Sequence, residues 1–112
     1  MKIFELPRLF GTRRRTQVLL LIYLLEETHA SEMAKLLGTT LKTVQRILVV
    51  LEDERIVTGR TVGRERRIRL DERYFAATEL NPLLAALVRR DGETEAAAES
   101  LRRRPRKRGK EI

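Results

Sequence analysis

The first strong pattern in the sequence is an uninterrupted apolar run, VLLLIYLL, at residues 18–25. Thr12 stands where a helix cap belongs, and we predict a helix from there to about Glu27. Because this segment is apolar on every side, the helix must be buried on more than one face. A small domain covers one face itself, so we expect a partner subunit to cover the other. Burial wholly within one subunit is the alternative.

Two shorter amphipathic helices are predicted next. The first covers about residues 30–37, and Gly38 ends it in the left-handed conformation. Thr39 or Thr40 then caps a helix that runs to about Glu54. Its apolar positions recur every three or four residues, at Leu41, Val44, Leu48 and Leu51, so one side is buried.

After Ile56 the period changes to two, which predicts a β-hairpin with strands at about 57–62 and 66–71 around the turn Gly63-Arg64-Glu65. Residues 71–80 are predicted to be helical. Asn81 then serves as an N-cap, and proline follows at the first position of a last helix that ends near Gly92. We expect an N-terminal arm at 1–11, one domain at 12–91 and a basic, disordered tail at 92–112, where little can be buried.

Composition narrows the function classes. The 112 residues contain 24 Lys and Arg against 16 Asp and Glu, a net charge of +8, which favours a polyanionic partner such as nucleic acid. Much of the excess lies in residues 101–112, which hold seven basic residues and one acid. There is no cysteine, so thiol-based metal, redox and disulfide chemistry are excluded. The apolar run is shorter than the roughly 20 residues of a membrane span, so we expect a soluble, cytoplasmic protein.

Two helices joined by a tight glycine turn and followed by a basic hairpin predict a mainly α fold of the winged helix-turn-helix type. The polar side of the helix at 40–54 carries residues suited to base edges and to close approach, against the alternative of an ordinary solvated face. These DNA-binding candidates are Thr39, Thr40, Lys42, Thr43, Gln45 and Arg46. The hairpin adds five arginines against the single acid Glu65, and such a cluster requires a nearby anion such as phosphate or a minor groove. They are Arg60, Arg64, Arg66, Arg67 and Arg69.

Three further arginines, Arg13, Arg14 and Arg15, oppose the dipole of the first helix and are candidate phosphate contacts, with solvation as the alternative. The basic tail either adds non-specific DNA affinity or acts as a solubilising segment. His29 has no partner at a catalytic spacing and is expected to cap a helix or lie at the surface. We find no catalytic site and expect no enzyme.

The segments LFGTRRRTQVLLLIYLLEE, ASEMAKLLGTTLKTVQRILVVLE and VGRERRIRL resemble the winged helix-turn-helix domain of the ArsR family of transcriptional regulators over about residues 9–88. The resemblance implies a repressor released by an effector, with a recognition helix at about 40–54 and a wing at about 58–70. It also implies a homodimer through the first and last helices. The interface residues are then Val18, Leu21, Ile22, Leu25, Leu83, Leu84, Leu87 and Val88.

Two departures from the family matter. Its members often sense metals through cysteine pairs or through histidines and carboxylates, whereas this chain has no Cys and one His, so we assign no metal and no cofactor. The recognition helix often ends in Glu-Gly, and here Arg55 follows Glu54. A left-handed arginine costs about 1 kcal/mol more than glycine, so we expect this helix to end differently and the wing to sit at another angle.

The sequence therefore predicts a sequence-specific, double-stranded-DNA-binding repressor whose operator, effector and regulated genes it does not specify. The alternatives are an RNA-binding winged helix that relies on its basic tail, and a protein-interaction module whose arginines match an acidic partner.

Overall fold

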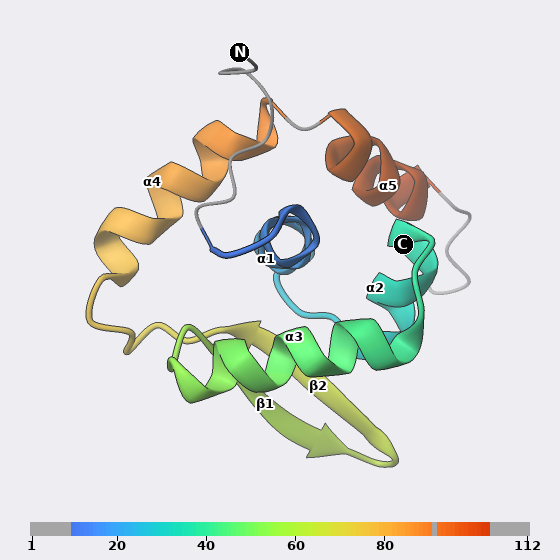
Figure 1. Cartoon of the computed structure of the whole chain (residues 1–112), viewed down its shortest axis with the longest axis horizontal. Helices are drawn as coiled ribbons and strands as arrows, with labels where there is room; N and C mark the ends of the chain where they lie inside the picture. The colour runs from blue at the N-terminus through green and yellow to red at the C-terminus, as the bar shows by residue number, and fades with distance from the viewer. Residues whose placement is uncertain (1–9, 91, 104–112) are drawn as a thin grey trace, which may run out of the picture.

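The computed structural model describes residues 10–90 and 92–103 and is mainly helical, with one antiparallel hairpin (Figure 1). This layout of helices and hairpin confirms the coarse fold class that the sequence predicts. No helix of the described part is long and apolar enough to cross a bilayer. The elements in chain order are α1 (Arg13–Leu25), α2 (Ala30–Leu37), α3 (Leu41–Asp53), β1 (Val57–Val62), β2 (Glu65–Leu70), α4 (Ala77–Val88) and α5 (Gly92–Arg103).

Local capping chemistry sets the start of the first three helices. The Thr12 hydroxyl accepts from the Arg15 N–H at 3.0 Å, and the Thr40 hydroxyl accepts from the Thr43 N–H at 3.1 Å, as a threonine N-cap should. His29 caps α2 with its Nδ1, which confirms a capping role for that residue. Each cap satisfies a backbone donor that the first turn leaves without an intrahelical partner.

The helix α1 forms the centre of the molecule, and Figure 1 views it end-on with the other elements around it. It packs against α2, α3, α4, α5 and β2. Every residue from Val18 to Ile22 is fully buried within the single chain. For residues 18–22, burial within one subunit, the alternative that we left open, is therefore what the structure shows, whereas Tyr23, Leu24 and Leu25 are half-buried.

This arrangement removes the packing argument for a partner subunit. Of the residues assigned to a dimer interface, Val18, Leu21, Ile22, Leu84, Leu87 and Val88 are at most 6% exposed and lie in the core of one chain. Leu25 is half-buried and Leu83 is 38% exposed. A homodimer stays a prediction, but these core residues are already fully packed.

The covering of α1 is completed by α5, a helix that our sequence analysis did not expect. Thr94 and Ala98, one turn apart, are fully buried, and their small side chains let the backbone of α5 approach α1 closely. The prediction of disorder from residue 92 is thus wrong for residues 92–103. Residues 104–112 of the predicted tail and residues 1–9 of the predicted arm lie outside the described residues.

The helix α4 also differs from expectation, because one helix runs through Asn81 and Pro82 instead of beginning there. Its buried stripe starts at Leu80, so the apolar face that packs on the core extends upstream of the proline. Proline removes the hydrogen bond to the carbonyl of Thr78, but both residues are exposed, so water can satisfy that carbonyl. The expected N-cap at Asn81 and the separate helix at 71–80 are therefore wrong.

In the hairpin, Val57 to Val62 pair with Leu70 to Glu65 in antiparallel register. The loop contains only Gly63 and Arg64, so Glu65 belongs to the strand and not to the turn as predicted. Gly63 has φ +65° at the first loop position, where glycine is favoured in two-residue hairpins. The far edge of β2 pairs with Thr28, which joins the α1–α2 connection to the hairpin.

The end of α3 fixes how the hairpin leaves the helical body. Arg55 has φ +64°, its N–H donates to the Glu52 carbonyl, and the Ile56 N–H donates to the Leu51 carbonyl. These two bonds form a Schellman motif, in which glycine usually holds the left-handed position. The same two bonds close α2, where Gly38 holds that position with φ +67°. Contrary to our expectation, α3 ends in the standard geometry despite its arginine.

Candidate nucleic-acid interface

The helices α2 and α3 pack against each other, and α3 buries one side on the core through Val44, Ile47, Leu48 and Leu51. The opposite side faces solvent. In Figure 1, α3 and the hairpin lie side by side along one edge of the molecule, and α3 packs against β1. The polar side of α3 and the hairpin therefore belong to one continuous surface.

The outward side of α3 presents three long polar side chains. Lys42, Gln45 and Arg46 are all exposed, as the sequence predicts. None of them has a side-chain hydrogen bond or ion pair among the described residues. Their donors are therefore available to an external acceptor, without an internal contact that must first be broken.

The threonines at the start of α3 serve the helix itself. Besides capping the Thr43 N–H, the Thr40 hydroxyl lies 2.8 Å from the Thr43 hydroxyl, so the two side chains are hydrogen-bonded to each other. Thr39 is half-buried in the turn between α2 and α3. Of the threonines assigned to DNA contact, Thr40 is exposed, and all three remain short enough to permit close approach.

Sequence analysis did not assign two exposed apolar residues on this surface. Val49 is 60% exposed one turn beyond Gln45. Leu41 is 43% exposed at the start of α3, so the prediction that it belongs to the buried stripe of this helix is wrong. Val49 also lines a mostly apolar groove of about 270 Å³ between α3 and the hairpin. The helical periodicity of α3 puts Val49 beside Lys42 and Arg46 on the polar side of the helix, so its exposure could have been predicted from the sequence.

Ion pairs inside the chain neutralise part of the hairpin. Arg66 reaches across Gly59 to α3, where its Nη2 lies 2.6 Å from Glu52 Oε1. Arg67 bridges two carboxylates, at 3.0 Å to Glu27 and 2.9 Å to Glu65. The hydrogen bond to Glu65, followed by that to Glu27, raises the pKa of the Arg67 guanidinium.

Two other contacts extend this network. Arg60 lies 3.6 Å from the same Glu27 carboxylate, although two thirds of its side chain is exposed. Glu65 also meets Nε2 of His29 at 2.9 Å, so the cap of α2 is connected to the hairpin. The chain thus supplies anions for Arg60, Arg66 and Arg67, whereas the sequence suggested that the five arginines need an external one.

Arg64 and Arg69 are the two hairpin arginines that remain. Both are exposed. Arg64 has no side-chain partner in the part of the chain that the structure describes, whereas the charge of Arg69 acts on Asp71 and helps to lower the pKa of that carboxyl. Arg64 stands in the two-residue turn at the tip. Among the five arginines, it is therefore the one best placed to reach a distant phosphate.

The arginines at the start of α1 have structural contacts. Arg14 donates to the Gln17 side chain at 2.9 Å and to the Leu37 carbonyl at 3.2 Å, which ties α1 to the end of α2. Arg15 donates to the Phe10 carbonyl at 2.8 Å. Arg13 is exposed. These neutral acceptors occupy some donors of Arg14 and Arg15 without neutralising their charge, and Arg15 Nε is buried with no hydrogen-bond partner among the described residues.

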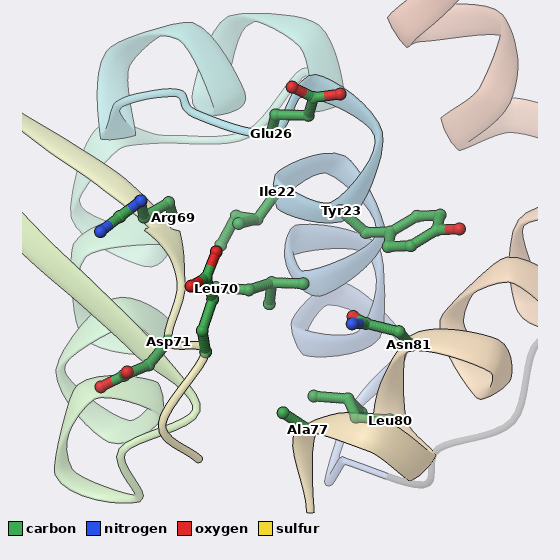
Figure 2. A pocket seen from close by; sticks show the side chains of 10 residues that line it. Ile22, Tyr23, Glu26, Arg69, Leu70, Asp71, Ala77, Leu80 and Asn81 are labelled. Atoms are coloured by element: carbon green, nitrogen blue, oxygen red, sulfur yellow. The ribbon is translucent and has the colours of Figure 1, made fainter.

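A pocket of about 320 Å³ lies where the base of the hairpin meets α1 and α4 (Figure 2). In Figure 2, Leu70 points toward α1, whereas Arg69 and Asp71 point away from it. Glu26 stands at the C-terminal end of α1. The described residues contain no group of three His, Cys, Asp or Glu side chains that could hold a metal ion. Its lining residues come from α1, α4 and the end of β2, so the pocket lies at the junction between the hairpin and the helical body.

Comparison of the chain with protein-family models, with curated proteins and with solved structures finds no match. The resemblance to the ArsR family accordingly stays a prediction that rests on the quoted segments alone.

Proposed function

We propose that the protein is a winged helix-turn-helix regulator that binds double-stranded DNA and represses transcription. The observation that carries the proposal is the outward trio Lys42, Gln45 and Arg46 on α3, free of internal side-chain partners in the described chain and adjacent to the hairpin. Repression in particular follows from the resemblance of the sequence to the ArsR family.

The dimensions of an α-helix suit this role. An α-helix with its side chains is about 10–12 Å across, and the major groove of B-DNA is about 12 Å wide. Arg46 and Gln45 carry the donors and acceptors that recognise guanine and adenine edges, whereas Lys42 suits a guanine or a phosphate. We therefore assign base contacts to α3.

The hairpin has a different role. Arg64 at its tip suits a phosphate or a minor groove, which gives affinity without sequence preference. Arg66 and Arg67 are held by carboxylates of the same chain and mainly position the hairpin against α3 and the α1–α2 connection. A second copy of the chain, with its α3 about one DNA turn or roughly 34 Å away, would complete recognition of a palindromic site.

Selection of bound duplexes from a random pool tests the proposal directly, because a specific regulator enriches one motif. On that motif, Arg46→Ala should weaken binding by about 1–3 kcal/mol and relax preference at one base pair. Arg64→Ala should weaken all duplexes nearly equally and lower the salt slope by about 1. Arg73→Ala removes one exposed arginine beyond the hairpin and is the matched charge control.

Four results would contradict the proposal. An unenriched pool would remove sequence specificity. Equal loss for Arg46→Ala on specific and random duplexes would remove its base contact. Preference for structured RNA over duplex DNA at physiological salt would favour the RNA-binding alternative, and the absence of duplex binding at moderate salt would favour a protein-interaction module.

A further inference from the structure

The outward side of α3 contains an apolar side chain among its polar ones. Val49 is 60% exposed. At about 100° per residue, it lies about 20° around the helix axis from Lys42, about 40° from Gln45 on one side and about 60° from Arg46 on the other. Val49 therefore lies within the arc that the outward trio covers. A surface that contacts all three polar side chains along the length of the helix also meets Val49.

Helix geometry brings this side chain close to the polar ones. Helical side chains lean toward the N-terminus, so Val49 covers the turn on which Gln45 and Arg46 stand. Together with Lys42 these positions have the spacing i, i+3, i+4 and i+7, by which other recognition helices place their base-reading side chains. A β-branched side chain has one dominant rotamer in a helix, so the two methyl groups of Val49 are held in place before any contact forms.

The surroundings of Val49 on the hairpin side are also mostly apolar. The groove of about 270 Å³ between α3 and the hairpin is lined by Val49 together with Leu48 and Ile68. Its two charged lining residues, Glu52 and Arg66, form an ion pair with each other at 2.6 Å. An apolar group that approaches Val49 from outside therefore meets an apolar patch without an unpaired charge in the groove.

The major groove of DNA offers one kind of apolar group on its base edges. Guanine presents two acceptors, adenine an acceptor and a donor, and cytosine a donor, whereas thymine presents a 5-methyl group beside its O4 acceptor. A valine pressed against the polar atoms would displace their water without replacing its hydrogen bonds, which costs free energy. The group that matches Val49 is therefore the 5-methyl group of a pyrimidine.

We propose that Val49 recognises a pyrimidine 5-methyl group in the major groove and sets a thymine preference within the DNA site. This inference rests on the proposed function and deepens it by naming the chemical group that Val49 reads. Val49 follows Arg46 by three residues, or about 4.5 Å along the helix axis, and successive base pairs are about 3.4 Å apart. The thymine should therefore lie within about two base pairs of the pair whose preference Arg46→Ala relaxes.

Removal of single methyl groups from the DNA tests the proposal. In a duplex that carries the motif enriched from the random pool, each thymine is replaced in turn by deoxyuridine, and the affinity of the full chain is measured by fluorescence anisotropy at fixed salt. Replacement of the thymine near the Arg46 pair should weaken binding about fourfold, or about 0.8 kcal/mol, the contribution of one buried carbon group. With cytosine at the same position, 5-methylation should strengthen binding by about the same factor.

Two serine variants assign the effect to Val49. Val49→Ser removes the apolar contact, and α3 should be retained because serine and valine have similar helix propensities. This variant should bind the thymine and deoxyuridine duplexes equally. Val62→Ser is the matched control, since it makes the same change at a valine of the hairpin that is 47% exposed, and it should keep the fourfold difference. Circular dichroism checks that both variants are folded.

The outcomes separate this inference from the proposed function. An enriched motif without a thymine near the Arg46 pair, or with thymines that all tolerate deoxyuridine, would overturn the role of Val49 while sequence-specific DNA binding stands. A methyl effect that survives in Val49→Ser would also overturn it. A loss with deoxyuridine but no gain with 5-methylcytosine would support the proposal and restrict the recognised methyl group to thymine. A pool without an enriched motif would overturn both proposals.

Discussion

The left-handed residue at the end of α3 allows a stability prediction in which backbone and side-chain effects separate. Arg55 holds the position that glycine usually takes in a Schellman motif, and its side chain is exposed without an internal partner in the described chain. Arg55→Gly should therefore remove backbone strain without the loss of a side-chain contact.

The magnitude follows from two opposing terms. A left-handed conformation costs a non-glycine residue about 1–2 kcal/mol. Glycine loses more conformational entropy on folding, which returns about 0.5–1 kcal/mol of that gain. The net expectation is a stabilisation of about 0.5–1 kcal/mol, or about 2–5 °C in the midpoint of thermal unfolding for a domain of this size.

Urea unfolding followed by circular dichroism provides the measurement, and Gly38 provides the matched control. Gly38 closes α2 with the same two hydrogen bonds, and a Cβ built there meets no atom within 4 Å. Gly38→Arg should consequently destabilise by about the same 0.5–1 kcal/mol, from backbone strain alone. A destabilised Arg55→Gly variant beside a destabilised Gly38→Arg variant would refute the reasoning, because it would show that the Arg55 side chain itself stabilises the fold.

Two further predictions concern the carboxylates near the hairpin. Glu52→Gln should lower the free energy of unfolding in urea by at most about 1 kcal/mol. It should also tighten binding to random duplex DNA and steepen the salt slope by about 0.9, because Arg66 is released to a phosphate. An unchanged slope would show that Arg66 does not reach DNA. The pKa of Asp71 is lowered, mainly by the hydrogen bond from the Arg73 N–H, so its contribution to stability is present at neutral pH and is lost as pH falls through the folded-state pKa. Asp71→Asn should accordingly be less stable than the unmodified protein at pH 7. The difference should begin to shrink below about pH 4 and be lost only below the folded-state pKa. A difference independent of pH would contradict this cause.

The parts of the fold that the sequence predicted correctly depend on neighbours along the chain. Thr12 and Thr40 act on N–H groups three residues away, and Gly38 acts on the turn in which it lies. The alternation around Ile68 likewise depends on its own strand. Such local chemistry is visible in a single sequence, so the first three helices and the hairpin were placed within a few residues.

Features that depend on distant contacts were missed. The apolar run in α1 indicated burial on several sides but did not show which segments provide the cover. The segment that completes it, α5, has a buried face of Thr94 and Ala98, which is too small to give an apolar stripe. Pro82 was read as a helix start because its local signal was stronger than the packing of Leu80 upstream.

The candidate site shows the same division. The exposure of Lys42, Gln45 and Arg46 followed from helical periodicity, because the opposite stripe had to be buried. The partners of the hairpin arginines did not follow, since Arg67 meets a glutamate 40 residues away, at Glu27. Counting acids within the hairpin therefore overestimated its unneutralised charge.

The central position of α1 also affects synthesis on the ribosome. The segment is translated before α5, which completes its cover and begins only at Gly92. At about 5–20 residues per second, roughly 3–13 s separate the end of α1 from the appearance of α5. During that interval α1 is an incompletely covered apolar segment of the kind that chaperones bind. Chains stalled before α5 should therefore bind chaperones more strongly than the full-length chain does.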